Sequence, residues 1–148
     1  MIIGLIPARG GSKGIKKKNI KDFCGKPLIY WTIKQALESK CLDRVIVSTD
    51  DIEIAEISSN YGAEVPFLRP KEISGDEATS VSTVIHLIDT IPKIKSILFL
   101  QPTSPLRNVS DIEGIISLQE ETKAQSIISL TEVTEHPSLM FSLNKKKI

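Results

Sequence analysis

The sequence predicts an α/β protein with a largely parallel sheet and helices packed against it. Two observations lead to this class. Short apolar runs rich in isoleucine and valine alternate along the chain with segments in which apolar residues recur at helical spacing. The 148 residues, 41% hydrophobic and 25% charged, are typical of one globular domain, which we expect to cover residues 1–148.

The strands and helices can be placed from these patterns. Strands are expected at residues 2–7, 44–49, 64–67, 96–100 and 126–130. Helices are expected at residues 28–40, 51–61, 81–91 and 111–119. The run at 96–100 is the most apolar, which favours a central position in the sheet.

Two of the helix starts carry a capping pattern. Asp50 precedes a helical segment and is followed three residues later by Glu53, and Ser110 is followed in the same way by Glu113. The pair Asp50 and Asp51 could also hold Mg²⁺, but capping by Asp50 is the commoner role and the one we favour.

Four loops are expected to meet at one edge of the sheet. In open parallel sheets, ligands bind outside the carboxyl ends of the strands. The segments that follow strands on that side are residues 7–19, 48–51, 68–80 and 101–107, and all are rich in polar side chains. The pattern therefore predicts a single binding site.

The first of these loops has the composition of a phosphate-binding turn. Gly10, Gly11 and Gly14 lie among Arg9 and several lysines. Glycine permits the φ > 0 conformations that turn backbone N–H groups toward an anion, and the cations add charge. The spacing matches neither the dinucleotide fingerprint nor the Walker A motif. We favour a polyphosphate cradle; the alternative is a solvated basic loop.

The charge distribution agrees with a small anionic ligand. Residues 1–40 contain nine Lys and Arg and two acidic residues, a net charge of +7, so the remainder carries −6 of the total of +1. One local positive field suits a nucleoside triphosphate, whereas nucleic-acid binding favours a broadly basic face.

No apolar run is long enough for a membrane span. The two cysteines have neither metal-site nor disulfide spacing, which suggests a cytoplasmic protein.

Several motifs together resemble one enzyme family. These are Pro7–Gly14, Lys18-Asn19, Gly25–Ile29 and Gln101–Arg107. The chain resembles the N-terminal part of the acylneuraminate cytidylyltransferases, also called CMP-sialic acid synthetases. The resemblance implies a Rossmann-like fold of the nucleotide-diphospho-sugar transferase type, with helices on both faces. It also implies a nucleotidyltransferase that joins CTP to a sialic-acid-type nonulosonic acid and releases pyrophosphate.

The resemblance also implies roles for individual residues. The nucleotide-binding residues would be Arg9, Gly11, Ser12, Lys18, Asn19, Arg69, Ala78 and Ser80, with Arg69 and Ser80 contacting cytosine. The acceptor sugar would contact Gln101 and Thr103, and the catalytic residues would be Arg9, Lys18 and Gln101. Two alternatives stay open: Ser80 could instead be a helix N-cap, and Arg107 could anchor its loop.

The family comparison further implies partners outside this chain. Its members use Mg²⁺ held by late aspartates and form dimers through a segment that we expect to begin at residues 131–148. Because those aspartates are absent here, we expect a chain truncated before the dimerisation arm, with no metal ligands and with a homodimer only at full length. A transferase for another sugar acid and a non-catalytic nucleotide-binding fragment remain the alternatives.

Overall fold

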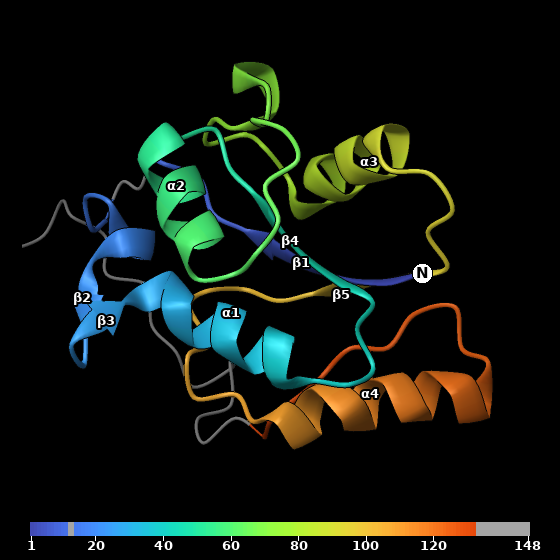
Figure 1. Cartoon of the computed structure of the whole chain (residues 1–148). Helices are drawn as coiled ribbons and strands as arrows, with labels where there is room; N and C mark the ends of the chain where they lie inside the picture. Colours follow the sequence, from blue (N-terminus) through green and yellow to red (C-terminus); the bar gives the residue numbers. More distant parts are fainter. Residues whose placement is uncertain (12–13, 133–148) are drawn as a thin grey trace, which may run out of the picture.

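A three-layer α/β arrangement is present in the computed structural model, which describes residues 1–11 and 14–132 (Figure 1). Its main sheet has three parallel strands in the order β4-β1-β5. They are β1 (Ile2–Pro7), β4 (Arg44–Ser48) and β5 (Ser96–Phe99). The predicted fold class is confirmed.

The central strand of the described sheet is β1. Gly4 faces Val45 of β4 on one side and Leu98 of β5 on the other. The prediction that the run at 96–100 would be central is wrong for the described residues, since β5 pairs only with β1 and all its residues are only partly buried. The apolar side chains of β5 pack against the hydrophobic cores on both faces of the sheet, which an edge strand can do as well as a central one.

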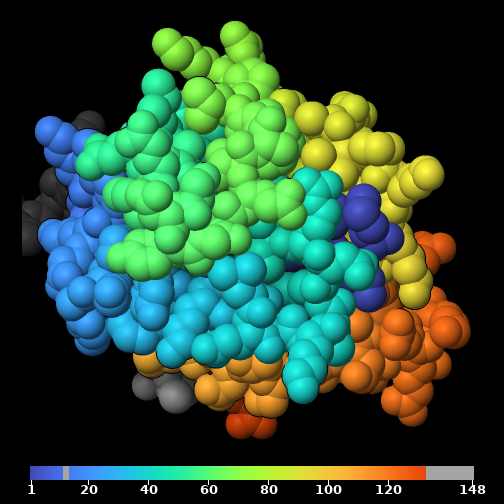
Figure 2. Space-filling model, in the orientation of Figure 1, coloured from blue at the N-terminus to red at the C-terminus, as the bar shows by residue number. Residues whose placement is uncertain are grey.

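Helices cover both faces of the sheet. On one face lie α1 (Leu28–Glu38), α2 (Ile52–Asn60) and α4 (Val109–Thr122), which share a core with alternate strand residues. On the other face lies α3 (Ser80–Thr90), whose Leu87 packs on Ile3, Leu5 and Ile46. In the space-filling view, α1, α2 and their flanking segments cover the sheet (Figure 2). Within the described residues, no helix has the length and apolar character that a bilayer span requires.

Two predicted strands are replaced by other structure. Residues 64–67 contribute one isolated parallel bridge, which joins Glu64 to Ile46, and the next bridge joins Leu68 to Thr49. Residues 126–130 form no strand, and Ile128 and Leu130 remain 76% and 91% exposed. Both predictions rested on apolar β-branched residues, but a strand also needs a neighbouring backbone, which 126–130 lack among the described residues.

The caps of two helices are shifted relative to the prediction. The N-cap of α2 is Asp51, not Asp50, and its Oδ1 accepts hydrogen bonds from the backbone N–H groups of Glu53 (2.9 Å) and Ile54 (3.2 Å). The extended backbone of Asp51 places its carboxylate over the first turn, which frees Asp50 for a different contact. After α2, Gly62 has φ of +94°, the left-handed conformation in which glycine commonly ends a helix.

The predicted cap of α4 is also wrong. The helix begins after Asn108, which forms a capping box with Asp111. Ser110 therefore lies inside the first turn, and the Glu113 carboxylate accepts a hydrogen bond from the backbone N–H of Lys40 at 3.3 Å. This contact ties α4 to the end of α1.

A small hairpin closes the loop that follows β1. It consists of β2 (Asp22–Phe23) and β3 (Lys26–Pro27), preceded by the 3-10 turn η1 (Lys18–Ile20). The Lys26 ammonium lies over the rings of Tyr30 (5.5 Å) and Tyr61 (5.8 Å), so cation–π contacts join the hairpin to α1 and α2. The hairpin thereby fixes the C-terminal end of the glycine-rich loop that follows β1.

Candidate active site

A cleft of about 560 Å³ opens at the carboxyl ends of β1 and β5. This volume lies within the usual range for small-molecule sites. The cleft is lined by residues of three of the four predicted loops, together with Thr83 of α3 and Phe99 of β5. The loop residues are Pro7, Arg9, Gly14, Ile15, Lys18, Asn19, Arg69, Ser74, Gly75, Asp76, Ala78, Thr79, Ser80, Gln101, Pro102 and Thr103. Eight of the ten predicted site residues are therefore brought together, namely Arg9, Lys18, Asn19, Arg69, Ala78, Ser80, Gln101 and Thr103.

The other two predicted residues are not placed at the cleft. Gly11 is exposed and does not line it, and Ser12 lies outside the described residues. Most of the expected dimerisation segment, residues 133–148, also lies outside the described part of the chain.

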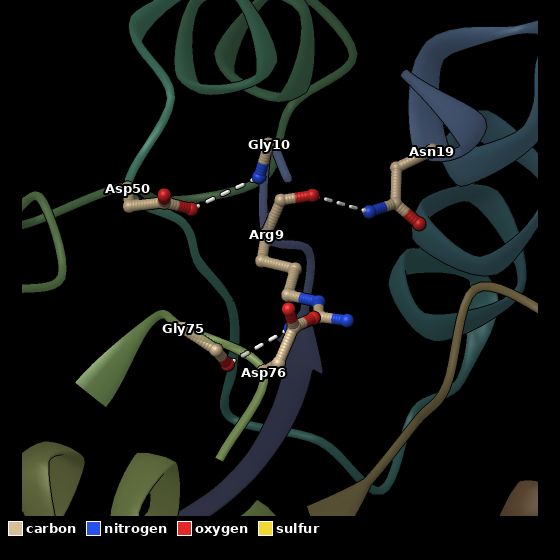
Figure 3. A network of polar contacts seen from close by, with 6 residues as sticks. All are labelled: Arg9, Gly10, Asn19, Asp50, Gly75 and Asp76. Carbon is tan, nitrogen blue, oxygen red and sulfur yellow. Dashed lines mark hydrogen bonds and ion pairs between the residues drawn. The ribbon is translucent and has the colours of Figure 1, made fainter. Parts of the chain in front are cut away.

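The turn after β1 is held by hydrogen bonds from both sides (Figure 3). The Asn19 side chain donates from Nδ2 to the backbone carbonyl of Arg9 at 3.0 Å, and Asn19 is itself buried. The Gly10 N–H donates to Oδ1 of Asp50 at 2.9 Å. Asp50 therefore holds the glycine turn, and this contact replaces the predicted capping role.

Gly10 is required for a close approach, and not for a left-handed conformation. A Cβ at this position would lie 2.6 Å from Oδ2 of Asp51, so a methyl group cannot be accommodated unless that cap moves. Neither Gly10 nor Gly11 has positive φ, which contradicts the predicted glycine nest at these residues. In addition, the Gly10 N–H is taken by an internal carboxylate and is not free for a phosphate.

Arg9 points across the cleft to the loop that precedes α3 (Figure 3). Its Nη1 donates to the carbonyl of Gly75 at 2.8 Å and lies 3.0 Å from Oδ1 of Asp76. Both side chains of this ion pair are partly exposed, Arg9 at 34% and Asp76 at 40%. Arg9 thus reaches the cleft, but in this structure its charge is met by a carboxylate of the same chain.

The lysines of the loop divide between two environments. Lys18 is half-buried, lines the cleft and forms no ion pair with the described residues. Lys17 pairs instead with Glu53 of α2, and the hydrogen bond to this carboxylate raises the pKa of Lys17.

Arg69 is the most deeply placed cation of the site. Only 6% of it is exposed, its Nε donates to Ser74 Oγ at 3.1 Å, and its Nη1 donates to Thr83 Oγ1 at 2.8 Å. Burial lowers the pKa of Arg69, while the negative charge of Asp50 acts in the opposite direction. An arginine with this many fixed contacts presents a defined set of donors to a ligand.

Ser80 does not cap α3. The N-cap is Thr79, whose Oγ1 accepts from the backbone N–H of Ser82 at 3.1 Å. Ser80 is the first residue of the helix, and together with Ala78 it lines the cleft. The alternative that Ser80 is a structural cap is therefore wrong, and its contact with cytosine stays a prediction.

The loop after β5 brings Gln101 and Thr103 to the cleft. Arg107 donates from Nη2 to the Gln101 carbonyl at 3.4 Å, which agrees with an anchoring role. Gln35 of α1 donates to the carbonyl of Pro105 at 2.7 Å and holds the same loop from the other side. Burial lowers the pKa of Arg107.

Four residues of the site were missed by the sequence reasoning. Ser74 and Thr83 anchor Arg69, Asp76 pairs with Arg9, and Asp50 binds the Gly10 amide. Asp50 and Asp76 do lie in the loops predicted to meet, but nothing in the sequence indicates which cation or amide each carboxylate contacts. Thr83 has no signal of its own, since a threonine in a helix is commonly a packing residue.

The described residues do not form a metal site. Across residues 1–11 and 14–132, no three His, Cys, Asp or Glu side chains converge in a way that could hold an ion. Asp76, which lines the cleft, pairs with Arg9, and the Asp50 carboxylate accepts from the Gly10 amide.

A comparison with protein families gives one match over almost the whole chain. The family model described as "Cytidylyltransferase" matches residues 3–148. The chain is 37% identical to the CMP-N,N'-diacetyllegionaminic acid synthase of Legionella pneumophila over 98% of its length and 64% of the relative. It is 40% identical to the N-acylneuraminate cytidylyltransferase of Escherichia coli over 88% of its length, and 38% identical to the pseudaminic acid cytidylyltransferase of Campylobacter jejuni over 95%.

This chain spans only part of these relatives, namely 64%, 31% and 62% of their lengths in the same order. Among solved structures, a CMP:2-keto-3-deoxy-manno-octonic acid synthetase complexed with CTP superposes with a TM-score of 0.73 at 22% identity. The superposition covers 83% of this chain and 48% of that one. A cytidylyltransferase from Leptospira borgpetersenii gives a TM-score of 0.65 at 21% identity, over 79% and 48% of the two chains. At these identities the two superpositions show a shared fold.

Proposed function

The chain belongs to the cytidylyltransferase family, and on that premise we propose that the complete protein transfers the CMP group of CTP to a nonulosonic acid and releases pyrophosphate. One observation carries the proposal. A single cleft gathers Arg9 and Lys18 from the glycine-rich turn, the buried guanidinium of Arg69, and Gln101 from the loop after β5. Cations suit the triphosphate, fixed donors suit the base, and an amide suits a sugar.

The reaction is a nucleotidyl transfer. The oxygen of the anomeric hydroxyl attacks the α-phosphorus of CTP, the bond from that phosphorus to the β-phosphate oxygen breaks, and pyrophosphate leaves with the electron pair. The hydroxyl proton is released, and no described residue is assigned as its acceptor. Arg9 and Lys18 would act as the catalytic cations, because they neutralise charge that develops on the leaving pyrophosphate.

The base would be read by Arg69 and Ser80. Cytosine presents its O2 and N3 atoms as acceptors and its N4 amino group as a donor, so a guanidinium and a hydroxyl are suitable partners. Arg69 is held by Ser74 and Thr83, and a donor that is fixed before binding loses less conformational freedom when the ligand arrives.

The acceptor is proposed only as a class. The relatives act on legionaminic, neuraminic and pseudaminic acids by their names, and identities of 37%, 40% and 38% do not favour one of them. Gln101 and Thr103 would face this sugar, with Gln101 close to the reacting hydroxyl. Arg107 and Gln35 would keep their loop in place.

Mg²⁺ is expected for the family, but the described residues do not form a site for it by themselves. We therefore derive no step through a metal ion.

We also propose that the complete protein is a homodimer in the cytoplasm, which the sequence resemblance to the family supports. A nucleic acid or a membrane is not expected as a partner.

Binding of the four common ribonucleoside triphosphates to the 148-residue chain tests this function. Isothermal titration calorimetry should show CTP binding at least about tenfold more tightly than UTP, ATP or GTP, about 1.4 kcal/mol, because Arg69 and Ser80 read the base. Equal affinities for all four would contradict the cytosine site. CTP binding by the complete protein without pyrophosphate release, when nonulosonic acids are supplied, would favour a non-catalytic nucleotide-binding function.

A further inference from the structure

We infer that Asp76 is an internal competitor of the triphosphate, which makes it a specificity-determining residue of the cleft. In this structure its carboxylate pairs with Arg9, the cation proposed to bind the distal phosphates. A ligand that needs Arg9 must displace this carboxylate, whereas a ligand that does not reach Arg9 is unaffected. The inference rests on the proposed function for the role of Arg9.

The contacts of the Arg9 guanidinium with Gly75 and Asp76 resemble those that an arginine makes with a phosphate group. Nη1 of Arg9 meets the Gly75 carbonyl at 2.8 Å and Oδ1 of Asp76 at 3.0 Å, so two acceptors of one loop converge on one guanidinium nitrogen (Figure 3). Carboxylates and phosphates present the same kind of oxygen acceptor to a guanidinium. Asp76 therefore stands where an oxygen of the nucleotide tail is expected.

The strength of the pair suits a contact that can be exchanged. Exposed ion pairs are weak, and here the two side chains are 34% and 40% exposed. A pair formed with an equilibrium constant of about 5 would lower the apparent affinity of any ligand that needs Arg9 about sixfold. A triphosphate brings several charges to the site and can overcome this competition, but a single phosphate gains much less.

The same contact links the two parts of the cleft. Gly75 and Asp76 lie in the segment between η2 (Lys71–Ile73) and Ala78, so the loop that would read the base is tied to the turn that would bind the tail. When phosphates take Arg9, this loop loses one of its attachments to the β1 turn. Occupancy of the tail site therefore changes the restraint on the base site.

The test compares two variants of the 148-residue chain that remove one negative charge each. Asp76→Asn removes the competing carboxylate, and Glu77→Gln is the matched control, because Glu77 is the exposed neighbour on the same loop. Tripolyphosphate is the probe, since it has no base, and calorimetry gives its affinity. CMP is the second ligand, which is not expected to reach Arg9.

We expect Asp76→Asn to bind tripolyphosphate at least about threefold more tightly than Glu77→Gln, with CMP affinity equal in the two variants. Partial unfolding cannot produce such a gain. In an Arg9→Ala background, the difference between the two variants should disappear, because the competed cation is gone.

Three results would overturn the inference. They are equal or weaker tripolyphosphate binding by Asp76→Asn, a gain that persists without Arg9, and the absence of tripolyphosphate binding in both variants. Calorimetry with the four nucleoside triphosphates distinguishes this failure from a failure of the proposed function. If only the proposed function is wrong, Asp76→Asn still binds tripolyphosphate more tightly than Glu77→Gln, but CTP binds no more tightly than the other triphosphates.

Discussion

Arg69→Met is expected to weaken CTP binding by at least about tenfold and to reduce the preference for CTP over UTP to within about threefold. The loss of affinity corresponds to about 1.4 kcal/mol or more, the range for a hydrogen bond to a charged group. Methionine fills much of the buried volume but supplies no donor to the base. It also leaves the hydroxyl groups of Ser74 and Thr83 without the guanidinium, so the free energy of unfolding should fall by about 1–3 kcal/mol.

Thr83→Val separates the base contact from the stability of the site. Valine has nearly the shape of threonine and removes only the hydroxyl that accepts from Nη1 of Arg69. This variant should lose stability while keeping most of the preference for CTP over UTP. The measurements are chemical denaturation and calorimetry with both nucleotides. If Arg69→Met keeps the full preference for CTP, then Arg69 does not read the base.

Arg9→Ala is expected to weaken CTP binding by about 10- to 100-fold and CMP binding by less than about threefold. Charge-assisted hydrogen bonds contribute about 1.5–3 kcal/mol, and the proposed partners of Arg9 are the distal phosphates that CMP lacks.

Calorimetry with the two nucleotides measures this difference, and Lys16→Ala is the control. Lys16 is an exposed cation of the same loop that does not line the cleft. Its removal should weaken CTP only slightly, through the long-range field, which added salt screens. Equal losses of CTP and CMP affinity in Arg9→Ala would show that Arg9 has a different role.

The fold was predictable from sequence because its elements carry local signals. Ile29, Ile33 and Ala36 recur at helical spacing and are all fully buried in α1. The helix starts were less predictable, because neighbouring residues offer the same chemistry. Asp50 and Asp51 both carry a carboxylate, and only the path of the chain after β4 decides that Asp51 reaches the first turn of α2.

Long-range contacts account for the part of the site that was missed. The Gly10 amide and the Asp50 carboxylate are 40 positions apart in sequence, and they meet because β1 and β4 end side by side. The convergence of the loops follows from the parallel sheet and was predictable. The pairing of a particular carboxylate with Arg9 or Gly10 depends on atomic positions that periodicity and composition do not specify.

A crystal structure of the chain with CTP would test the central claim most directly. We expect the triphosphate beside Arg9 and Lys18, with Asp76 no longer paired to Arg9, and the cytosine ring within hydrogen-bond distance of Arg69 and Ser80. A nucleotide bound elsewhere, with Arg9 still paired to Asp76 and the turn after β1 facing solvent, would contradict it.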